Sequence, residues 1–203
     1  MVSQAWKGLE RYVAKCLEGK RIPRGANFSD SLPDVVADSS ISIPGSEGVI
    51  FVECKHSKNQ PWIDYIEPVY DGQPILAGTK NIQPIVLFEL ADIGLISNFV
   101  PTDSTPVLDR AVPGYMHSHI DQAKMYIDLY KSDKILEYTI HNSTNLESIA
   151  CELPLVVMAK KHSSFRLAYV ALKDLYNFYF MQNDKRYRDL QKKIRKNNII
   201  RAS

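Results

Sequence analysis

The fold is decided by the stretch Val49-Ile50-Phe51-Val52-Glu53-Cys54-Lys55, an apolar run that ends in charged residues. The turn signal Pro44-Gly45-Ser46 precedes it, and its β-branched and aromatic side chains predict a β-strand. Side chains alternate between the two faces of a strand, so Glu53 and Lys55 share one face and Cys54 lies on the other. An acid and an ammonium at the end of an apolar strand suit a cleft where a cation meets an anionic substrate.

Two elements upstream add further acids to this picture. The stretch Leu32-Pro33-Asp34-Val35-Val36-Ala37 predicts a second short strand with an acid near its start. Residues 3–18 predict a helix that Ser3 can cap. Its apolar stripe consists of Trp6, Leu9, Val13, Ala14 and Leu17. Glu10 lies on this stripe, where a carboxylate is unfavourable unless it is paired, bound to a metal, or able to reach solvent at the edge.

Pro33-Asp34, followed after a gap by Glu53-Cys54-Lys55, resembles the motif of the PD-(D/E)xK nuclease superfamily. With Glu10 on the first helix, the order and spacing are most similar to the archaeal-type Holliday junction resolvases. The resemblance implies a restriction-endonuclease-like α/β fold, with a central mixed sheet flanked by helices. It also implies a Mg²⁺-dependent deoxyribonuclease, with Mn²⁺ as a substitute.

The same resemblance assigns roles to the residues of the motif. Asp34 and Glu53 are expected as direct metal ligands, with the backbone carbonyl of Cys54 as a third, since Mg²⁺ prefers oxygen ligands and keeps several waters. Glu10 would bind a second cation or hold a metal-bound water. Lys55 would orient or activate the attacking water and offset the charge of the scissile phosphate.

A glutamine-bearing helix follows the Glu-x-Lys strand in many members of the superfamily. Residues 115–130 predict a helix, and Gln122 within it is the first candidate for this helper glutamine. A second alignment places the helix at residues 62–70, which makes Gln73 the nearest glutamine and residues 85–90 the next strand. Both alignments remain open from the sequence.

Residues 19–31 form a loop or short strand rich in glycine, basic and hydroxyl residues, which can hold a phosphate. The resemblance extends to this loop, because resolvase-like nucleases carry a basic loop here. The expected DNA contacts are Lys20, Arg21, Arg24 and Ser29, together with Lys58 after the main strand. The alternative is an ordinary polar connector.

The rest of the chain predicts one domain over residues 1–203 with two additions. Residues 59–114 hold seven of the eleven prolines and are expected to be an insertion that borders the cleft or forms an oligomer surface. Strands are expected at residues 153–159 and 165–172, followed by a helix from residue 173 to residue 180. Residues 183–203 form a basic tail with eight Lys or Arg and two Asp, which suggests attraction to a polyanion such as nucleic acid.

Composition limits the class of protein. The 203 residues are 45% hydrophobic, with no apolar run near the roughly 20 residues of a membrane helix and no signal-peptide core at the N-terminus. Three widely spaced cysteines without a CxxC motif argue for reduced thiols in a cytoplasmic compartment. We therefore expect no membrane partner.

The leading hypothesis is a DNA endonuclease whose substrate includes branched DNA. We expect it to act as a homodimer, because a four-way junction offers two equivalent strands to cut. Restriction, repair and exonuclease types share the same site residues and stay open. Non-catalytic alternatives are a nucleic-acid-binding protein of the same fold and an interaction protein that uses residues 59–114 as its docking surface.

Overall fold

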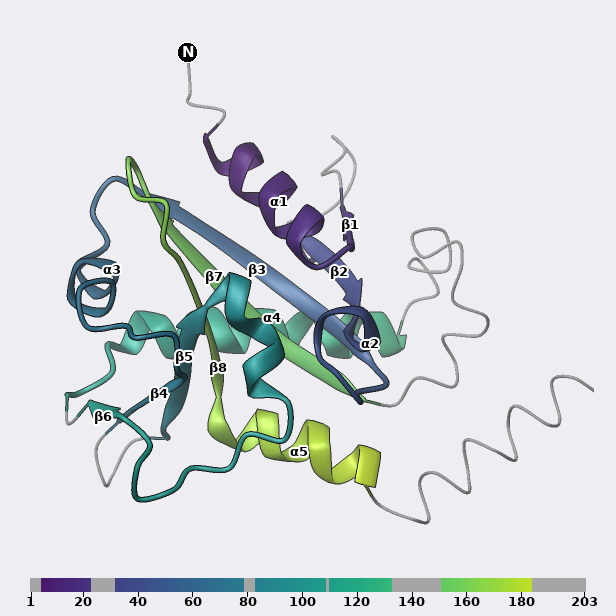
Figure 1. Ribbon diagram of the computed structural model, residues 1–203. Coiled ribbons are helices and arrows are strands. Elements are labelled where there is room, and N and C mark those ends of the chain that lie inside the picture. The colour runs from purple at the N-terminus through teal and green to yellow at the C-terminus, as the bar shows by residue number, and fades with distance from the viewer. Residues whose placement is uncertain (1–4, 23–31, 79–82, 109, 133–150, 184–203) are drawn as a thin grey trace, which may run out of the picture.

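The computed structural model describes residues 5–22, 32–78, 83–108, 110–132 and 151–183 (Figure 1). The strands are β1 (Lys20–Arg21), β2 (Val35–Asp38), β3 (Val49–Ser57), β4 (Ile75–Ala77), β5 (Ile85–Glu89), β6 (Val107–Leu108), β7 (Glu152–Lys160) and β8 (Arg166–Ala171). The helices are α1 (Ala5–Cys16), α2 (Ser39–Ser42), α3 (Pro61–Ile66), the 3-10 helix η1 (Leu90–Ile96), α4 (Gly114–Ser132) and α5 (Leu172–Asn183).

Within these ranges the strands form one eight-stranded sheet in the order β1-β2-β3-β7-β8-β5-β4-β6. The long strand β3 lies between β2, with which it is antiparallel, and β7, with which it is parallel. Parallel neighbours need a crossover connection, and α4 lies on the chain between β3 and β7. The sheet is therefore mixed, and the predicted α/β class with a central mixed sheet and flanking helices is confirmed at this level.

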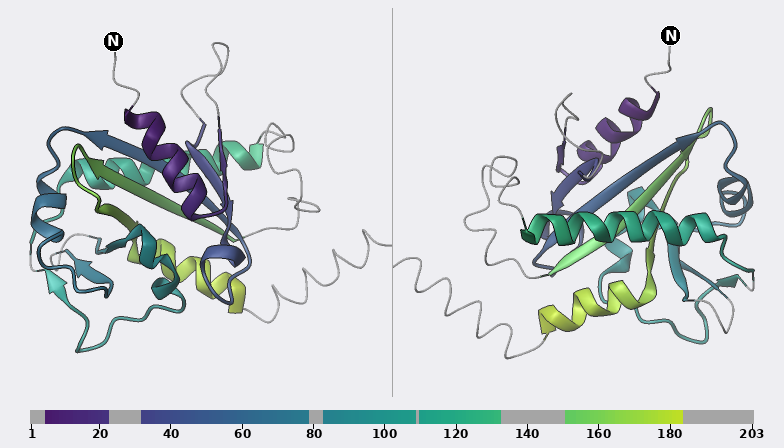
Figure 2. Two further views of the ribbon diagram at one scale, coloured as in Figure 1. Left: turned by 45° about the horizontal axis from the view of Figure 1, so that its top comes forward. Right: turned by 180° about the vertical axis from the view of Figure 1, so that it is seen from behind.

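Helices cover both faces of the sheet, as the two views of Figure 2 show. On one face, Ile50 and Val52 of β3 pack in a core with apolar residues of α1, η1 and α5. On the other face, Phe51 packs against Tyr126 of α4, and Met116 of the same helix joins a core that includes α3. The alternation of buried residues along β3 thus separates an α1 face from an α4 face.

The start of β3 depends on close contact between two backbones. The N–H of Val49 donates to the carbonyl of Cys151 at 2.9 Å. A Cβ added at Gly48 would lie 2.4 Å from that same carbonyl oxygen and 2.9 Å from the ring of Phe178. Only glycine allows the backbones to approach this closely at the edge of the parallel pair.

Most expected elements are confirmed, with shifted ends. The strand at residues 49–55 continues to Ser57, and the helix at residues 115–130 spans Gly114–Ser132. The first helix ends at Cys16, and Trp6, expected on its buried stripe, is 40% exposed because burial begins one turn later at Leu9. β2 begins after Pro33 and Asp34 rather than at Leu32.

Much of region 59–114, the predicted insertion, is part of the sheet. It supplies β4, β5 and β6, and β5 pairs directly with β8 along five residues. Four of the five residues of β5 are buried, so the strand belongs to the core of the fold. The basic tail from residue 184 onward lies outside the described residues. No helix among the described residues is long and apolar enough to span a membrane.

Candidate active site

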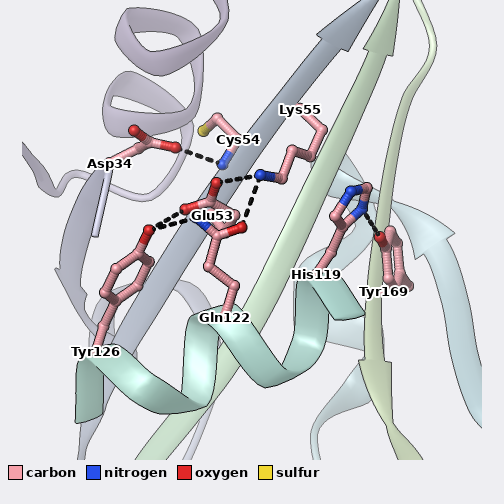
Figure 3. A network of polar contacts seen from close by, with 8 residues as sticks. All are labelled: Asp34, Glu53, Cys54, Lys55, His119, Gln122, Tyr126 and Tyr169. Atoms are coloured by element: carbon pink, nitrogen blue, oxygen red, sulfur yellow. Dashed lines mark hydrogen bonds and ion pairs between the residues drawn. The ribbon is translucent and has the colours of Figure 1, made fainter. Parts of the chain in front are cut away.

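The charged residues of β3 lie where the strand changes from buried to partly exposed. Its first five residues, up to Glu53, are buried, and the next four are only partly buried. Glu53 itself is 2% exposed, whereas the side chain of Lys55 keeps 25% of its surface accessible. The acid is therefore buried, and the ammonium beside it is partly open to solvent; Figure 3 shows the contact between them.

Asp34 is brought to β3 by an irregularity in the ladder between β2 and β3. Val35 pairs with Val52, yet the N–H of Asp34 also donates to the carbonyl of Val52 at 3.0 Å. Asp34, which directly precedes β2, and Val35 thus face one residue of β3, an arrangement of the bulge type that changes the direction of a side chain. The Asp34 carboxylate accepts the backbone N–H of Cys54 at 2.7 Å, and Asp34 is 3% exposed.

Glu53 is held from two sides. One of its carboxylate oxygens lies 2.6 Å from the Lys55 Nζ, and the other accepts the hydroxyl of Tyr126 at 2.9 Å. Burial, followed by the nearby negative charge of Asp34, raises the pKa of Glu53, while Lys55 and Tyr126 act in the opposite direction. The two buried acids thus repel each other, and one ammonium only partly compensates for this repulsion.

The sheet-facing residues of α4 complete the network. The Lys55 Nζ donates to the Oε1 of Gln122 at 2.8 Å, and the Nε2 of Gln122 donates to the hydroxyl of Tyr126 at 2.8 Å. Glu53, Lys55, Gln122 and Tyr126 therefore form a closed ring of hydrogen bonds, visible in Figure 3. Gln122 is the glutamine at this site, whereas Gln73 lies exposed in a turn.

Two residues of α4 at this site were not found from the sequence. Tyr126 follows Gln122 by four positions, so the helical repeat puts both on one face, and this spacing was the available signal. His119, one turn before Gln122, has its Nδ1 2.9 Å from the hydroxyl of Tyr169. Burial and the nearby Lys55 lower the pKa of His119 to about 4, so the imidazole is neutral at pH 7.

Cys54 presents its backbone, not its sulfur, to Asp34. Burial, then the charge of Asp34, raises the pKa of the Cys54 thiol well above its ordinary value. In the metal-free protein the sulfur is therefore a neutral thiol at pH 7. The carbonyl of a strand residue points to the same side as its N–H, so the Cys54 carbonyl is directed toward Asp34.

Glu10 is not part of this ring of hydrogen bonds. It is 3% exposed and forms an ion pair with Arg21 of β1. Arg21 is paired with Val35, which packs in the core together with Leu9 of α1. Glu10 thus lies on the α1 face, on the other side of the sheet from Glu53. Its predicted role as a metal ligand stays a prediction, and its carboxylate already has a cationic partner.

The predicted DNA contacts have different outcomes in the structure. Lys20 at the start of β1 and Lys58 just after β3 are exposed and accessible to a phosphate. Arg21 is committed to Glu10 and is only partly exposed. Arg24 and Ser29 lie outside the described residues. Lys58 follows Lys55 by three residues in the sequence.

The donor set fits a divalent cation with few protein ligands. Among the described residues, no three His, Cys, Asp or Glu side chains are grouped in the way of a closed metal site. Mg²⁺ does not need such a group, because it is usually held by one or two carboxylates and waters. Asp34 and Glu53 supply two buried carboxylates against the single charge of Lys55, and a cation there would relieve their repulsion.

Comparisons with protein-family models, with curated proteins and with solved structures find no match for this chain. Its interpretation therefore depends on the chemistry of the residues described above.

Proposed function

We propose that this chain is a metal-dependent deoxyribonuclease with a PD-(D/E)xK active site and a restriction-endonuclease-like core. The observation that carries the proposal is the convergence of Asp34, Glu53, Lys55 and Gln122, which are distant in the chain, around the end of β3. Buried carboxylates beside a lysine whose ammonium is partly open to solvent are unfavourable in an ordinary core. They are useful where a cation and a phosphate have to be bound together.

In this proposal each residue has a defined task. Asp34 and Glu53 would hold Mg²⁺ or Mn²⁺, with the Cys54 carbonyl as a further oxygen donor. The cation, when bound, would supply an acidified water and neutralise phosphate charge. Lys55 would position the attacking water and the scissile phosphate through its ammonium, and Gln122 fixes the direction of the Lys55 side chain. Tyr126 holds Glu53 in place through its hydroxyl.

The preferred substrate is a finer proposal. The order of Glu10, Asp34, Glu53 and Lys55 supports a Holliday junction resolvase, which would act as a homodimer on branched DNA. The basic tail at residues 183–203 would attract the phosphate backbone, and its removal should weaken binding and flatten its salt dependence. An unchanged salt slope would reject the tail as a phosphate contact.

The test is a cleavage assay on junction, flap, duplex and single-stranded DNA, with Mg²⁺, Mn²⁺ or EDTA. We expect cleavage only with metal, and a loss of at least about a hundredfold in the variants Asp34→Asn and Glu53→Gln. Binding of DNA in EDTA should persist in both variants. The matched control is Asp103→Asn, which removes an exposed carboxylate far from β3 in the chain. Equal rates for Asp34→Asn and the parent would reject the site.

A non-catalytic nucleic-acid-binding protein is the second candidate, and one observation favours it. Both oxygens of Glu53 already have partners within the chain, from Lys55 and Tyr126, so the ring is complete without a cation. The same assay separates the two candidates. Binding of DNA without cleavage under every metal condition would favour the binding protein.

A further inference from the structure

The exposed and partly exposed side chains of α1 include two aromatic rings and three cations. Trp6 is 40% exposed and Tyr12 is 38% exposed. Lys7, Arg11 and Lys15 lie on the same helix, and none of them is buried. We call these five residues the α1 surface.

The rings of the α1 surface are bordered by positive charge. The Lys7 Nζ lies 5.3 Å from the centre of the Trp6 ring, and the guanidinium carbon of Arg166 lies 5.3 Å from the centre of the Tyr12 ring. Both distances are within the range of cation–π contacts. Glu10, the acid in the sequence of α1, points inward to Arg21 and so does not offset these charges.

Residues of the sheet extend the α1 surface on the α1 face, which is opposite to the face of Glu53 and Lys55. His56 follows Lys55 on β3 and faces the α1 side, because residues on a strand alternate between faces. Arg166 of β8 pairs with Ala159 on the same face, and its charge contributes to the lowered pKa of His56. Glu89 is the acid that faces Arg166 from β5. Figure 2 shows α1 crossing this face while α4 covers the other.

We propose that the α1 surface binds an unpaired DNA strand, so that the substrate carries a single-stranded segment in addition to the strand that is cleaved. The inference rests on the proposed nuclease function and specifies its substrate class. Aromatic rings stack only on bases that are free of a duplex, whereas the cations follow the phosphate backbone. A surface with both is selective for a flap, a gap or the splayed arms of a junction over an intact duplex.

The test measures binding in EDTA, without cleavage, by fluorescence anisotropy. The probes are a labelled oligothymidylate of about 16 nucleotides and a duplex of the same length. We expect Tyr12→Ala and Trp6→Ala to weaken binding of the single strand by about tenfold, with little change for the duplex. Tyr12→Phe keeps the ring and should keep the affinity. Tyr176→Ala is the matched control, because Tyr176 is 41% exposed on α5.

The outcomes are separable. Unchanged single-strand binding in both alanine variants, or an equal loss for single strand and duplex, overturns the inference, provided that thermal melting shows folded variants. If one alanine variant does not fold, the single-strand affinity of the other alanine variant is compared with that of Tyr12→Phe. Equal affinities would overturn the inference. Cleavage by the parent is scored separately with Mg²⁺. Cleavage without an effect of the α1 surface rejects this inference alone. Selective binding in a chain that never cleaves rejects the nuclease proposal instead.

Discussion

Replacing Glu53 by glutamine should make the metal-free protein more stable at pH 8 and at the same time abolish cleavage. Glu53 is 2% exposed, and burial together with the charge of Asp34 raises its pKa. Glutamine has nearly the same shape and keeps an oxygen for Tyr126 or Lys55, but it carries no charge. The substitution therefore removes a repulsion that the folded state maintains for its function.

The sign of this effect follows from the raised pKa of Glu53. A carboxyl whose pKa is higher in the folded state than its ordinary 4.5 gives its full stability below about pH 4.5 and loses it as pH rises through the folded pKa. The variant escapes this loss, so we expect about 1–2 kcal/mol of added stability at pH 8, within the usual range for a stabilising single substitution. This corresponds to roughly 3–6 °C in Tm for a chain of this size.

The assay is urea and thermal unfolding at pH 8 and pH 4, with EDTA and then with MgCl₂. The advantage of Glu53→Gln should be present at pH 8 and absent at pH 4. Added Mg²⁺ should stabilise the parent by about 2.7 kcal/mol at a hundred times its Kd, and the variant much less. Glu18→Gln, which changes an exposed glutamate, is the control and should follow the parent throughout.

Two results would refute this reasoning. A destabilised variant at pH 8 would mean that the ion pair with Lys55 outweighs burial and the repulsion from Asp34. Equal stabilisation of parent and variant by Mg²⁺ would mean that Glu53 does not hold the cation.

Three further predictions use other parts of the structure. Gly48→Ala should cost about 2–4 kcal/mol in a urea melt, because its Cβ would clash with backbone, whereas Gly8→Ala has open space and should add up to about 1 kcal/mol. Tyr126→Phe leaves Glu53 short of a donor and should cost about 1.5–3 kcal/mol at pH 8, measured in the same way. His119, whose pKa is about 4 instead of 6.5, stabilises fully above pH 6.5 and loses this contribution as pH falls toward 4, so His119→Gln should flatten unfolding profiles in that window.

The sequence was most informative where a local repeat decides direction. Alternation along residues 49–55 placed Glu53 and Lys55 on one face. In the structure the Lys55 Nζ lies 2.6 Å from a carboxylate oxygen of Glu53. Helical spacing likewise placed Glu10 on the buried side of α1. Local repeats cannot identify a partner, however. The pairing of Glu10 with Arg21 depends on how α1 packs on β1, which no short pattern encodes.

Contacts between residues far apart in the sequence, and strands of only two or three residues, could not be predicted from local patterns. Lys55 and Gln122 meet only because α4 crosses the sheet, so the choice between Gln122 and Gln73 needed the three-dimensional arrangement. β4 has three residues and β6 has two, which is too few to show alternation. Region 59–114 therefore looked like an insertion, although its strands complete one side of the sheet.

During synthesis β3 leaves the ribosome before β7 has been translated. The two strands pair Val49 with Glu152, which lie about half of the 203-residue chain apart. Until then the apolar part of β3 lacks its main neighbour, and such exposed strands depend on chaperones and fold slowly. The acids and Gln122 cannot be fixed in place in the nascent polypeptide. Synthesis itself therefore delays the assembly of the candidate active site until β7 has emerged.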